Sequence, residues 1–276
     1  MPQSVESKIV EFQKKITSWY KVNKRDLPWR RTSDPYHILV SEMMLQQTQV
    51  SRVIPKYRAW LEEYPSLQSL ADADISRVLR LWMGLGYNRR AIYLQKTAQV
   101  VVSQYKGVFP EKEKALLTLP GIGKYTARAL LSFAFGKHIP VVDTNIKKVI
   151  LVAVLHQDTA PDKNIEEWAA RLLPKEHSIS ARDWNQALMD YASLELKDKK
   201  IIIPKQSKFR GSDRYYRGQV LRLLLAQKDC RLSHALLLKK FQGKETAWLT
   251  ALLAGLEKDG LVHYDGKQIY LTKKVD

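Results

Sequence analysis

Two carboxylates stand in sequence surroundings where a carboxyl group could do acid–base or electrostatic chemistry. Glu42 lies in the apolar run SEMMLQQTQV, and burial there would raise its pKa toward the range of a general acid. Asp143 follows the apolar turn HIPVV and directly precedes an expected helix. A surface glutamate in a helical charge pattern, or an aspartate that caps a helix, would look the same. Neither segment decides the role of its carboxylate alone.

The segment LPGIGKYTARAL, residues 119–130, could hold an anion. Gly121 and Gly123 allow a sharp backbone turn just before a helix. The N–H groups of the first helical turn could then bind a phosphate without reading a base sequence, and Lys124 adds a positive charge there. An ordinary turn between two helices has the same pattern. The segment is therefore compatible with a phosphate site and with a plain connection.

The composition favours a nucleic-acid partner. The 276 residues include 46 Lys and Arg against 28 Asp and Glu, and the formal charge of +18 suggests a polyanion, although a solvated basic surface would also produce it. Cys230 is the only cysteine, which excludes an internal disulfide and any cysteine-ligated zinc or iron–sulfur cluster, so we expect no metal and no cofactor. The N-terminus lacks a signal-peptide core, and no apolar run reaches the roughly 18 residues of a membrane span. We expect an intracellular protein, cytoplasmic or nucleoid-associated, without membrane contact.

Apolar residues recur at helical spacing throughout residues 1–204. Asp34-Pro35 is a start signal for a helix that we expect to carry Glu42, Gln46 and Gln47. Further helices are expected at residues 9–20, 66–84, 89–105, 111–117, 124–136, 146–155, 165–173 and 180–194. Strand-like alternation is almost absent from this part of the chain. The sequence predicts an all-helical first domain over residues 1–204.

The remaining sequence predicts a second, smaller domain over residues 205–276. Residues 197–214 are densely positive and broken by proline and glycine, as is typical of a linker. Helical patterns follow at residues 215–227, 232–241 and 244–258. LVHYDGKQIYL then alternates around Asp265-Gly266, a strong hairpin signal. Three helices before a β-hairpin predict a winged-helix-like module, a helix-turn-helix variant. The 15 basic and 7 acidic residues of this domain fit contact with DNA, and packing against the first domain or a partner stays open.

Four motifs follow one another within residues 8–196: LPWRRTSDPYHILVSEMMLQQTQV, LWMGLGYNRRAIYL, LPGIGKYTARALLSFAFGKHIPVVDTN and NQALMDYASLEL. In that order they resemble the helix-hairpin-helix (HhH-GPD) DNA glycosylases of the endonuclease III superfamily, most specifically the MutY-type adenine glycosylases. The resemblance implies a mainly α, two-lobed helix-hairpin-helix fold. It implies hydrolysis of the N-glycosidic bond of adenine mispaired with 8-oxoguanine or G, after base flipping, in base excision repair. Double-stranded DNA with a mispaired or damaged base is then the expected partner of a monomeric enzyme.

The catalytic residues of the family match four positions of this chain. Glu42 matches the glutamate that protonates the purine ring nitrogen, and Asp143 matches the aspartate that stabilises the oxocarbenium-like sugar, a division of tasks like that of glycoside hydrolysis. Tyr125 and Asn145 match residues that help to position the sugar and the carboxylates. Bifunctional members place a nucleophilic lysine at position 125, and a phenol cannot form an imine. The resemblance therefore implies a monofunctional glycosylase.

Further positions are expected to hold the DNA. In the hairpin these are Gly121, Gly123 and Lys124, because of the anion-binding pattern described above, and Lys147 is expected at a phosphate or on a solvated helix face. The residues that match the lining of the adenine pocket are Trp29, Arg30 and Asp190. The residues that match those entering the duplex and touching the opposite base are Gln47, Thr48, Leu85 and Tyr87. A planar side chain is suited to fill the space that a flipped base leaves.

Two features depart from the MutY-type pattern. The cysteines that ligate a [4Fe–4S] cluster after the NQALMD helix are absent, and the winged-helix-like module stands where the family has a larger, β-rich domain that recognises 8-oxoguanine. Thr144 occupies a position where Gly is common. One alternative is a mismatch glycosylase that removes T or U opposite G, since Tyr125 also occurs in relatives of that kind. Another is a non-catalytic DNA-binding protein on the same fold.

Overall fold

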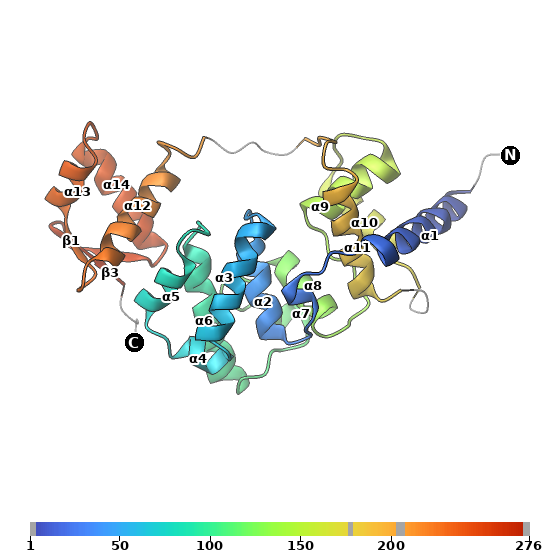
Figure 1. Cartoon of the computed structure of the whole chain (residues 1–276), viewed down its shortest axis with the longest axis horizontal. Helices are drawn as coiled ribbons and strands as arrows, with labels where there is room; N and C mark the ends of the chain where they lie inside the picture. Colours follow the sequence, from blue (N-terminus) through green and yellow to red (C-terminus); the bar gives the residue numbers. More distant parts are fainter. Residues whose placement is uncertain (1–3, 176–178, 203–207, 273–276) are drawn as a thin grey trace. The chain divides into compact units, whose positions relative to one another are not determined.

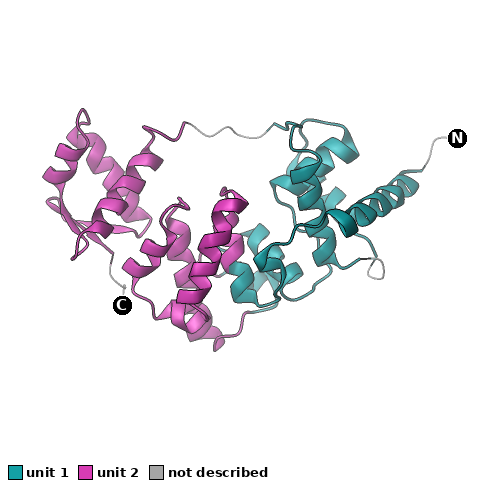
Figure 2. Cartoon of the chain, in the orientation of Figure 1, with its two compact units in different colours: residues 1–39, 110–118, 122–204 teal, residues 40–109, 119–121, 205–276 magenta. Residues whose placement is uncertain are grey.

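The computed structural model describes residues 4–175, 179–202 and 208–272, which are mainly helical as predicted (Figure 1). They form two compact units, each assembled from separate stretches of the chain (Figure 2). Unit 1 comprises residues 1–39, 110–118 and 122–204, and unit 2 comprises residues 40–109, 119–121 and 205–276. The predicted domain boundary between residues 204 and 205 lies outside the described residues. No helix of the described part is long and apolar enough to cross a membrane.

Unit 1 is a set of helices around one apolar core. Its elements are α1 (Val5–Asn23), the 3₁₀ turn η1 (Pro28–Arg30), the start of α2 (Pro35–Leu45), α7 (Glu113–Leu116), α8 (Lys124–Phe133), α9 (Thr144–Val149), the π-helical η2 (Ile150–Leu155), α10 (Asp162–Leu172) and α11 (Ala181–Leu194). Side-chain caps fix where helices begin: the Ser180 hydroxyl accepts a hydrogen bond from the N–H of Asp183 at the start of α11. The core includes Ile16 of α1, Ile150 of η2 and Trp184 of α11. This packing holds α9, which follows Asp143, against α11.

Unit 2 contains a second group of helices and a C-terminal module. The helices are the remainder of α2, α3 (Val50–Glu63), α4 (Leu67–Ala71), α5 (Ile75–Trp82) and α6 (Arg89–Tyr105). Trp60 and Trp82 are fully buried and meet edge to face, with ring centroids 5.5 Å apart. These two rings join α3 to α5.

Two predicted helices have different bounds in the structure. The helix expected to carry Gln46 and Gln47 ends at Leu45, and Gln47 adopts a left-handed conformation with φ 53°. The guanidinium of Arg90 donates hydrogen bonds to the carbonyl oxygens of Met43 and Gln46, both at 2.7 Å, which stabilises the turn after the helix. The helix expected over residues 66–84 is divided into α4 and α5. The Asp74 carboxylate caps α5 by accepting from the N–H of Ser76 at 2.8 Å.

The C-terminal module, defined here as residues 208–272, has the predicted three helices followed by a hairpin. Its elements are α12 (Asp213–Ala226), β1 (Arg231–Ser233), α13 (His234–Lys240), α14 (Thr246–Lys258), β2 (Val262–Tyr264) and β3 (Gln268–Leu271). β1 was not predicted, because its three residues are too few for alternation to be visible. It pairs antiparallel with β3, which also pairs with β2, so the sheet order is β1-β3-β2. Apolar residues of α12 and α14, including Leu224 and Leu253, are buried in the module.

Candidate active site

Asp143 in unit 1 lies at the N-terminus of α9 and does cap this helix. Its Oδ1 accepts from the N–H of Ile146, and its Oδ2 accepts from Nδ2 of Asn145, both at 2.7 Å. Burial raises the pKa of Asp143 above its ordinary value, and these hydrogen bonds lower it only in part. Asp143 is half-buried, and its carboxylate is thus held by neutral amide donors. A carboxylate held in this way can cap a helix and can also act on a nearby positive charge.

The turn before Asp143 is fixed by Asn185 of α11. Asn185 is 1% exposed. Its Oδ1 accepts from the N–H of Val141 at 3.0 Å, and its Nδ2 donates to the carbonyl of Ile139 at 3.1 Å. Both sides of one amide therefore hold the apolar turn in register, so the position of Asp143 depends on a residue more than forty positions later in the chain.

Tyr125 lies in the first turn of α8, and Gly123 caps that helix in an extended conformation without a side-chain cap. Lys124 Nζ pairs with Glu166 at 2.6 Å, and Lys147 Nζ pairs with Asp162 at 2.6 Å. Both pairs reach the surface, where an ion pair contributes little and can be exchanged for a phosphate. Lys124 therefore lies at the start of α8 and Lys147 in the last turn of α9, and both predicted phosphate-binding lysines are ion-paired in this structure.

Gly121, the other hairpin glycine, belongs to unit 2. It has φ +75°, and a Cβ added there would lie 2.5 Å from Cβ of Tyr93. The hydroxyl of Thr97 donates to the carbonyl of Pro120 at 2.7 Å, which holds the turn against α6. Only glycine suits this position, for both conformational and steric reasons.

Asp190 of α11 is fully buried and accepts hydrogen bonds from two arginines. Arg30 donates through both terminal nitrogens, at 2.6 and 2.8 Å, and Arg25 donates through its backbone N–H at 3.0 Å and through its guanidinium. Burial by itself would raise the pKa of Asp190, but the hydrogen bonds and positive charges of Arg30 and Arg25 outweigh it and hold the pKa below its ordinary value. Trp29 precedes Arg30 in η1 and is buried. Arg30 and Asp190, both matched to the adenine pocket, are thus brought together as an ion pair.

Glu42 lies in unit 2, on α2, and is 6% exposed. Its neighbours Ser41 and Met43 are each 1% exposed. The alternative of a surface glutamate is therefore wrong, and the predicted burial is confirmed. Burial disfavours a charged carboxylate unless partners compensate.

The residues matched to duplex entry lie in unit 2 on two adjoining turns. Thr48 lies after α2, and its hydroxyl donates to the carbonyl of Leu85 at 3.4 Å. Tyr87 is 40% exposed with φ 47°, a left-handed conformation that costs free energy for a non-glycine residue. The Arg90 guanidinium donates to the carbonyls of Leu85 and Gly86 at 3.1 and 2.8 Å and so stabilises this turn. The structure brings Thr48, Leu85 and Tyr87 together through Arg90.

Three residues that position the site were not identified from the sequence. Arg25, Arg90 and Asn185 are polar residues that hold buried partners. Asn185 stands on the apolar face of its helix, a pattern that could have indicated a buried hydrogen-bonding role. No comparable signal separates Arg25 or Arg90 from the arginines beside them in the sequence.

Comparisons with known proteins establish the family. A model of the HhH-GPD superfamily base excision DNA repair proteins matches residues 40–175. A solved structure of a thermostable thymine-DNA glycosylase is 32% identical, has a TM-score of 0.64, and aligns over 70% of this chain and 89% of its own. The chain belongs to the HhH-GPD superfamily.

Other relatives of this HhH-GPD chain agree with that assignment. The adenine DNA glycosylase of Mycolicibacterium smegmatis is 46% identical over 177 residues, which are 63% of this chain and 60% of that relative. A non-covalent complex of endonuclease III with DNA has a TM-score of 0.62 at 18% identity, over 73% of this chain and 91% of that one, which shows the shared fold. The chain spans 58–60% of the length of the first curated relatives that it matches.

An iron–sulfur cluster does not fit the residues of this HhH-GPD chain. Cys230, partly exposed, lies in the C-terminal module, and a [4Fe–4S] cluster held by protein thiolates needs more than one cysteine. Within the described ranges, no group of three or more His, Cys, Asp and Glu residues is placed to hold a metal ion.

Proposed function

We propose that this chain is a monofunctional DNA glycosylase that hydrolyses the N-glycosidic bond of mispaired adenine, opposite 8-oxoguanine or G, in base excision repair. The observation that carries the choice of adenine is the 46% identity to an adenine DNA glycosylase. The buried Glu42 and the amide-held Asp143 supply the two carboxylates that the chemistry needs.

The proposed reaction divides the work between these carboxylates. Glu42, kept from water, donates its proton to a ring nitrogen of adenine, so that the base leaves as a neutral group. The C–N bond breaks, and positive charge develops on the sugar. Asp143 stabilises that charge while Asn145 holds the carboxylate in orientation. Water then adds to the sugar and loses a proton, which restores the Glu42 carboxyl group, and an abasic site remains in an intact strand.

Tyr125 limits the reaction to base removal. A phenol cannot form the imine through which a lysine at this position would cut the strand, and Tyr125 lies in the first turn of α8 in the same unit as Asp143. We propose that the enzyme acts as a monomer on double-stranded DNA and works without metal or cofactor.

A second candidate function has its own support. The thymine-DNA glycosylase structure is 32% identical and is covered over 89% of its length, compared with 60% for the adenine DNA glycosylase of Mycolicibacterium smegmatis. Removal of T, or of U, opposite G is therefore the runner-up. A non-catalytic DNA-binding role is less suited, because phosphate binding needs no buried carboxylate such as Glu42.

The test is base release from duplexes that carry A·8-oxoguanine, A·G, A·C, T·G or U·G pairs, followed by alkaline cleavage of abasic sites. We expect release from the adenine pairs and no strand cleavage before alkali. Glu42→Gln should lower the rate at least about 100-fold, whereas Glu62→Gln, at an exposed position of α3, should retain it. Release of T or U without adenine would establish the runner-up, and no release from any duplex, with duplex affinity retained, would favour the binding role.

A further inference from the structure

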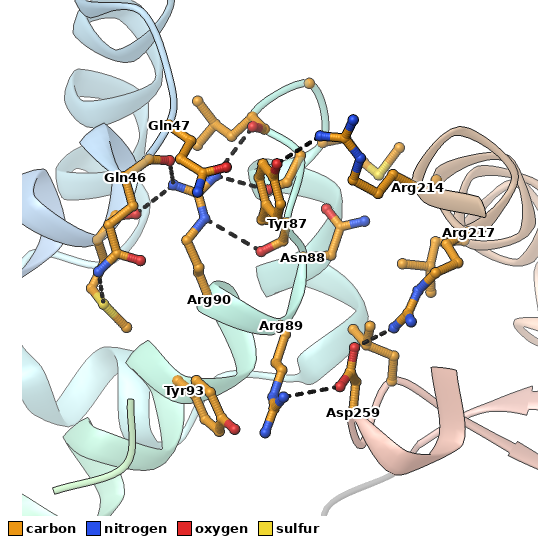
Figure 3. Close-up of a pocket in the computed structure, with 18 of the residues that line it drawn as sticks. Gln46, Gln47, Tyr87, Asn88, Arg89, Arg90, Tyr93, Arg214, Arg217 and Asp259 are labelled. Carbon is orange, nitrogen blue, oxygen red and sulfur yellow. Dashed lines mark hydrogen bonds and ion pairs between the residues drawn. The ribbon is translucent and has the colours of Figure 1, made fainter. Parts of the chain in front are cut away.

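Unit 2 contains a pocket that the chemical steps proposed for Glu42 and Asp143 do not use. Its volume is about 820 Å³, within the range of ligand sites. One side is formed by the turns after α2 and before α6, and the other by α12 and the end of α14 in the C-terminal module (Figure 3). The family model ends at residue 175, so it describes only the first of these two sides.

The lining of this pocket is strongly positive. Among the described residues that line it are six arginines, and Asp259 is its acidic residue. Three of the arginines have structural tasks. The Arg90 guanidinium donates hydrogen bonds to carbonyl oxygens of the turns. Arg89 and Arg217 pair with the Asp259 carboxylate from two sides, Arg89 at 3.2 Å (Figure 3).

The Asp259 cluster fixes the module to the helices of unit 2. It joins α6, α12 and the end of α14 through one carboxylate. A separate bond, from Nη2 of Arg80 to the carbonyl of Leu225 at 2.8 Å, joins α5 to the end of α12. Defined polar contacts therefore hold the two sides of the pocket together, and its positively charged side chains surround one hollow.

Arg52 of α3 and Arg222 of α12 supply charge that these contacts do not neutralise. Both are exposed, and within the described residues neither forms an ion pair, while Nη1 of Arg222 donates to Oε1 of Gln219 at 3.5 Å. They come from opposite sides of the pocket. Two exposed guanidinium groups around one hollow suit oxygen atoms of phosphates.

The pocket adjoins the turn matched to duplex entry. Gln47, Leu85 and Tyr87 line it. Nη1 of Arg214, in α12, donates to the hydroxyl of Tyr87 at 2.8 Å (Figure 3). The module thus touches the side chain that the family resemblance places at the base opposite the excised one.

We propose that this pocket binds backbone phosphates of the DNA strand that carries the opposite base, with Arg52 and Arg222 as the phosphate-binding residues. The choice of strand rests on the proposed function, and phosphate binding itself does not. The C-terminal module then acts as a second clamp on the duplex, beside the turn that carries Tyr87. Phosphate contacts of this kind set register and affinity without reading sequence.

The test is the salt dependence of duplex binding by the full chain. Arg52→Ala combined with Arg222→Ala should make the slope of log K against log salt less negative by about 1.8, roughly 0.9 for each phosphate contact. The matched control combines Arg58→Ala, exposed on α3 outside the pocket, with Lys240→Ala, exposed on α13. The control should retain the wild-type slope. Arg52→Lys combined with Arg222→Lys should have a slope close to that of the wild type, because the positive charges are kept. Circular dichroism melting confirms that each variant is folded.

Neutral methylphosphonate linkages assign the strand. Placed next to the mispair in the strand with the opposite base, they should weaken wild-type binding and leave the double-alanine variant unaffected, which is a coupling between the two changes.

Equal slopes for the variant and the control would overturn the proposal. If the linkages weaken wild-type binding more than binding by the double-alanine variant only when they stand in the strand with the excised base, the strand assignment is wrong. Binding of inorganic pyrophosphate by the wild type but not by the variant, with equal duplex affinity, would make the pocket a free-phosphate site and also overturn it. A wild type that releases no base would refute the proposed function while leaving the slope comparison intact.

Discussion

Asp143 and Asp190 are two aspartates of the same unit with opposite surroundings. Asp190 is enclosed with two arginines, so its pKa lies below the ordinary value despite burial. Asp143 is held by amide N–H donors of Asn145 and Ile146, so burial prevails and its pKa is raised. A charged partner fixes a carboxylate as a structural anion. Neutral donors orient a carboxylate and leave its charge to act on something else.

The largest expected effect comes from removing the charged partner of Asp190. Arg30→Ala would leave a buried carboxylate with half of its donors, and we expect a loss of about 3 kcal/mol in unfolding free energy. Urea denaturation measures it. Arg31→Ala is the matched control, because Arg31 pairs with Asp26 at the surface, and it should leave the urea midpoint unchanged. An equal loss in both variants would show that Asp190 is not a buried anion held by Arg30.

A smaller loss is expected from Asn185→Ala, which connects the two regions. Asn185 lies on the same helix as Asp190 but holds the turn before Asp143. Leaving the N–H of Val141 without its acceptor should cost about 2 kcal/mol. The variant should also release base more slowly, whereas Asn164→Ala, at an exposed position of α10, should change neither quantity. Lost stability with an unchanged rate would separate the turn from the chemistry.

Asn145→Ala should reduce stability by only about 1 kcal/mol, the net value of a typical hydrogen bond. Its clearer effect is on pH dependence. Burial raises the pKa of Asp143, and the bond from Asn145 opposes that rise. Removing the bond raises the pKa further, so the acidic limb of base release against pH should move to higher pH. An acidic limb at the wild-type pH would mean that Asp143 does not govern it.

The smallest effect on stability is expected from Asp143→Asn. Because burial raises the pKa of Asp143 above its unfolded value, the folded state holds the proton more tightly. The stability that this residue contributes is present below the unfolded pKa, about 3.9, and is lost as pH rises through the folded pKa. Asparagine cannot ionise and can still cap α9. Thermal melts should therefore show the variant no less stable than the wild type at pH 7, with its relative advantage shrinking toward pH 4. A large loss of stability at pH 7 would place Asp143 with Asp190 as a structural anion.

Helical periodicity predicted most of the fold, because the apolar residues that recur at helical spacing in α1, α6 and α11 are the ones that are buried in the structure. The predictions differed from the structure where a polar side chain overrides that pattern. Arg90 stabilises the turn after Leu45, and Asp74 starts a new helix within a continuous apolar pattern. The first contact joins residues that are distant in sequence, and the second depends on a single capping residue. Apolar periodicity indicates neither.

The candidate site was predicted in part. The burial of Glu42 and the capping position of Asp143 follow from the apolar residues around them and from the helix start after Asp143. The pairing of Asp190 with Arg25 and Arg30 could not be predicted, because the segment RDLPWRR offers three arginines and nothing local selects between them. The pocket of unit 2 depends on how the C-terminal module packs on α5 and α6, which no local pattern encodes.

The most direct test of the account is the single-turnover rate of adenine release by the Asp143→Asn variant from a duplex with an A·8-oxoguanine pair. The wild type is measured beside it, both at pH 7 and both folded by circular dichroism. If Asp143 is the carboxylate that stabilises the developing positive charge, the rate should fall at least about 100-fold without loss of thermal stability. Release at the wild-type rate would contradict the assignment of Asp143 and, with it, the difference in role between Asp143 and Asp190.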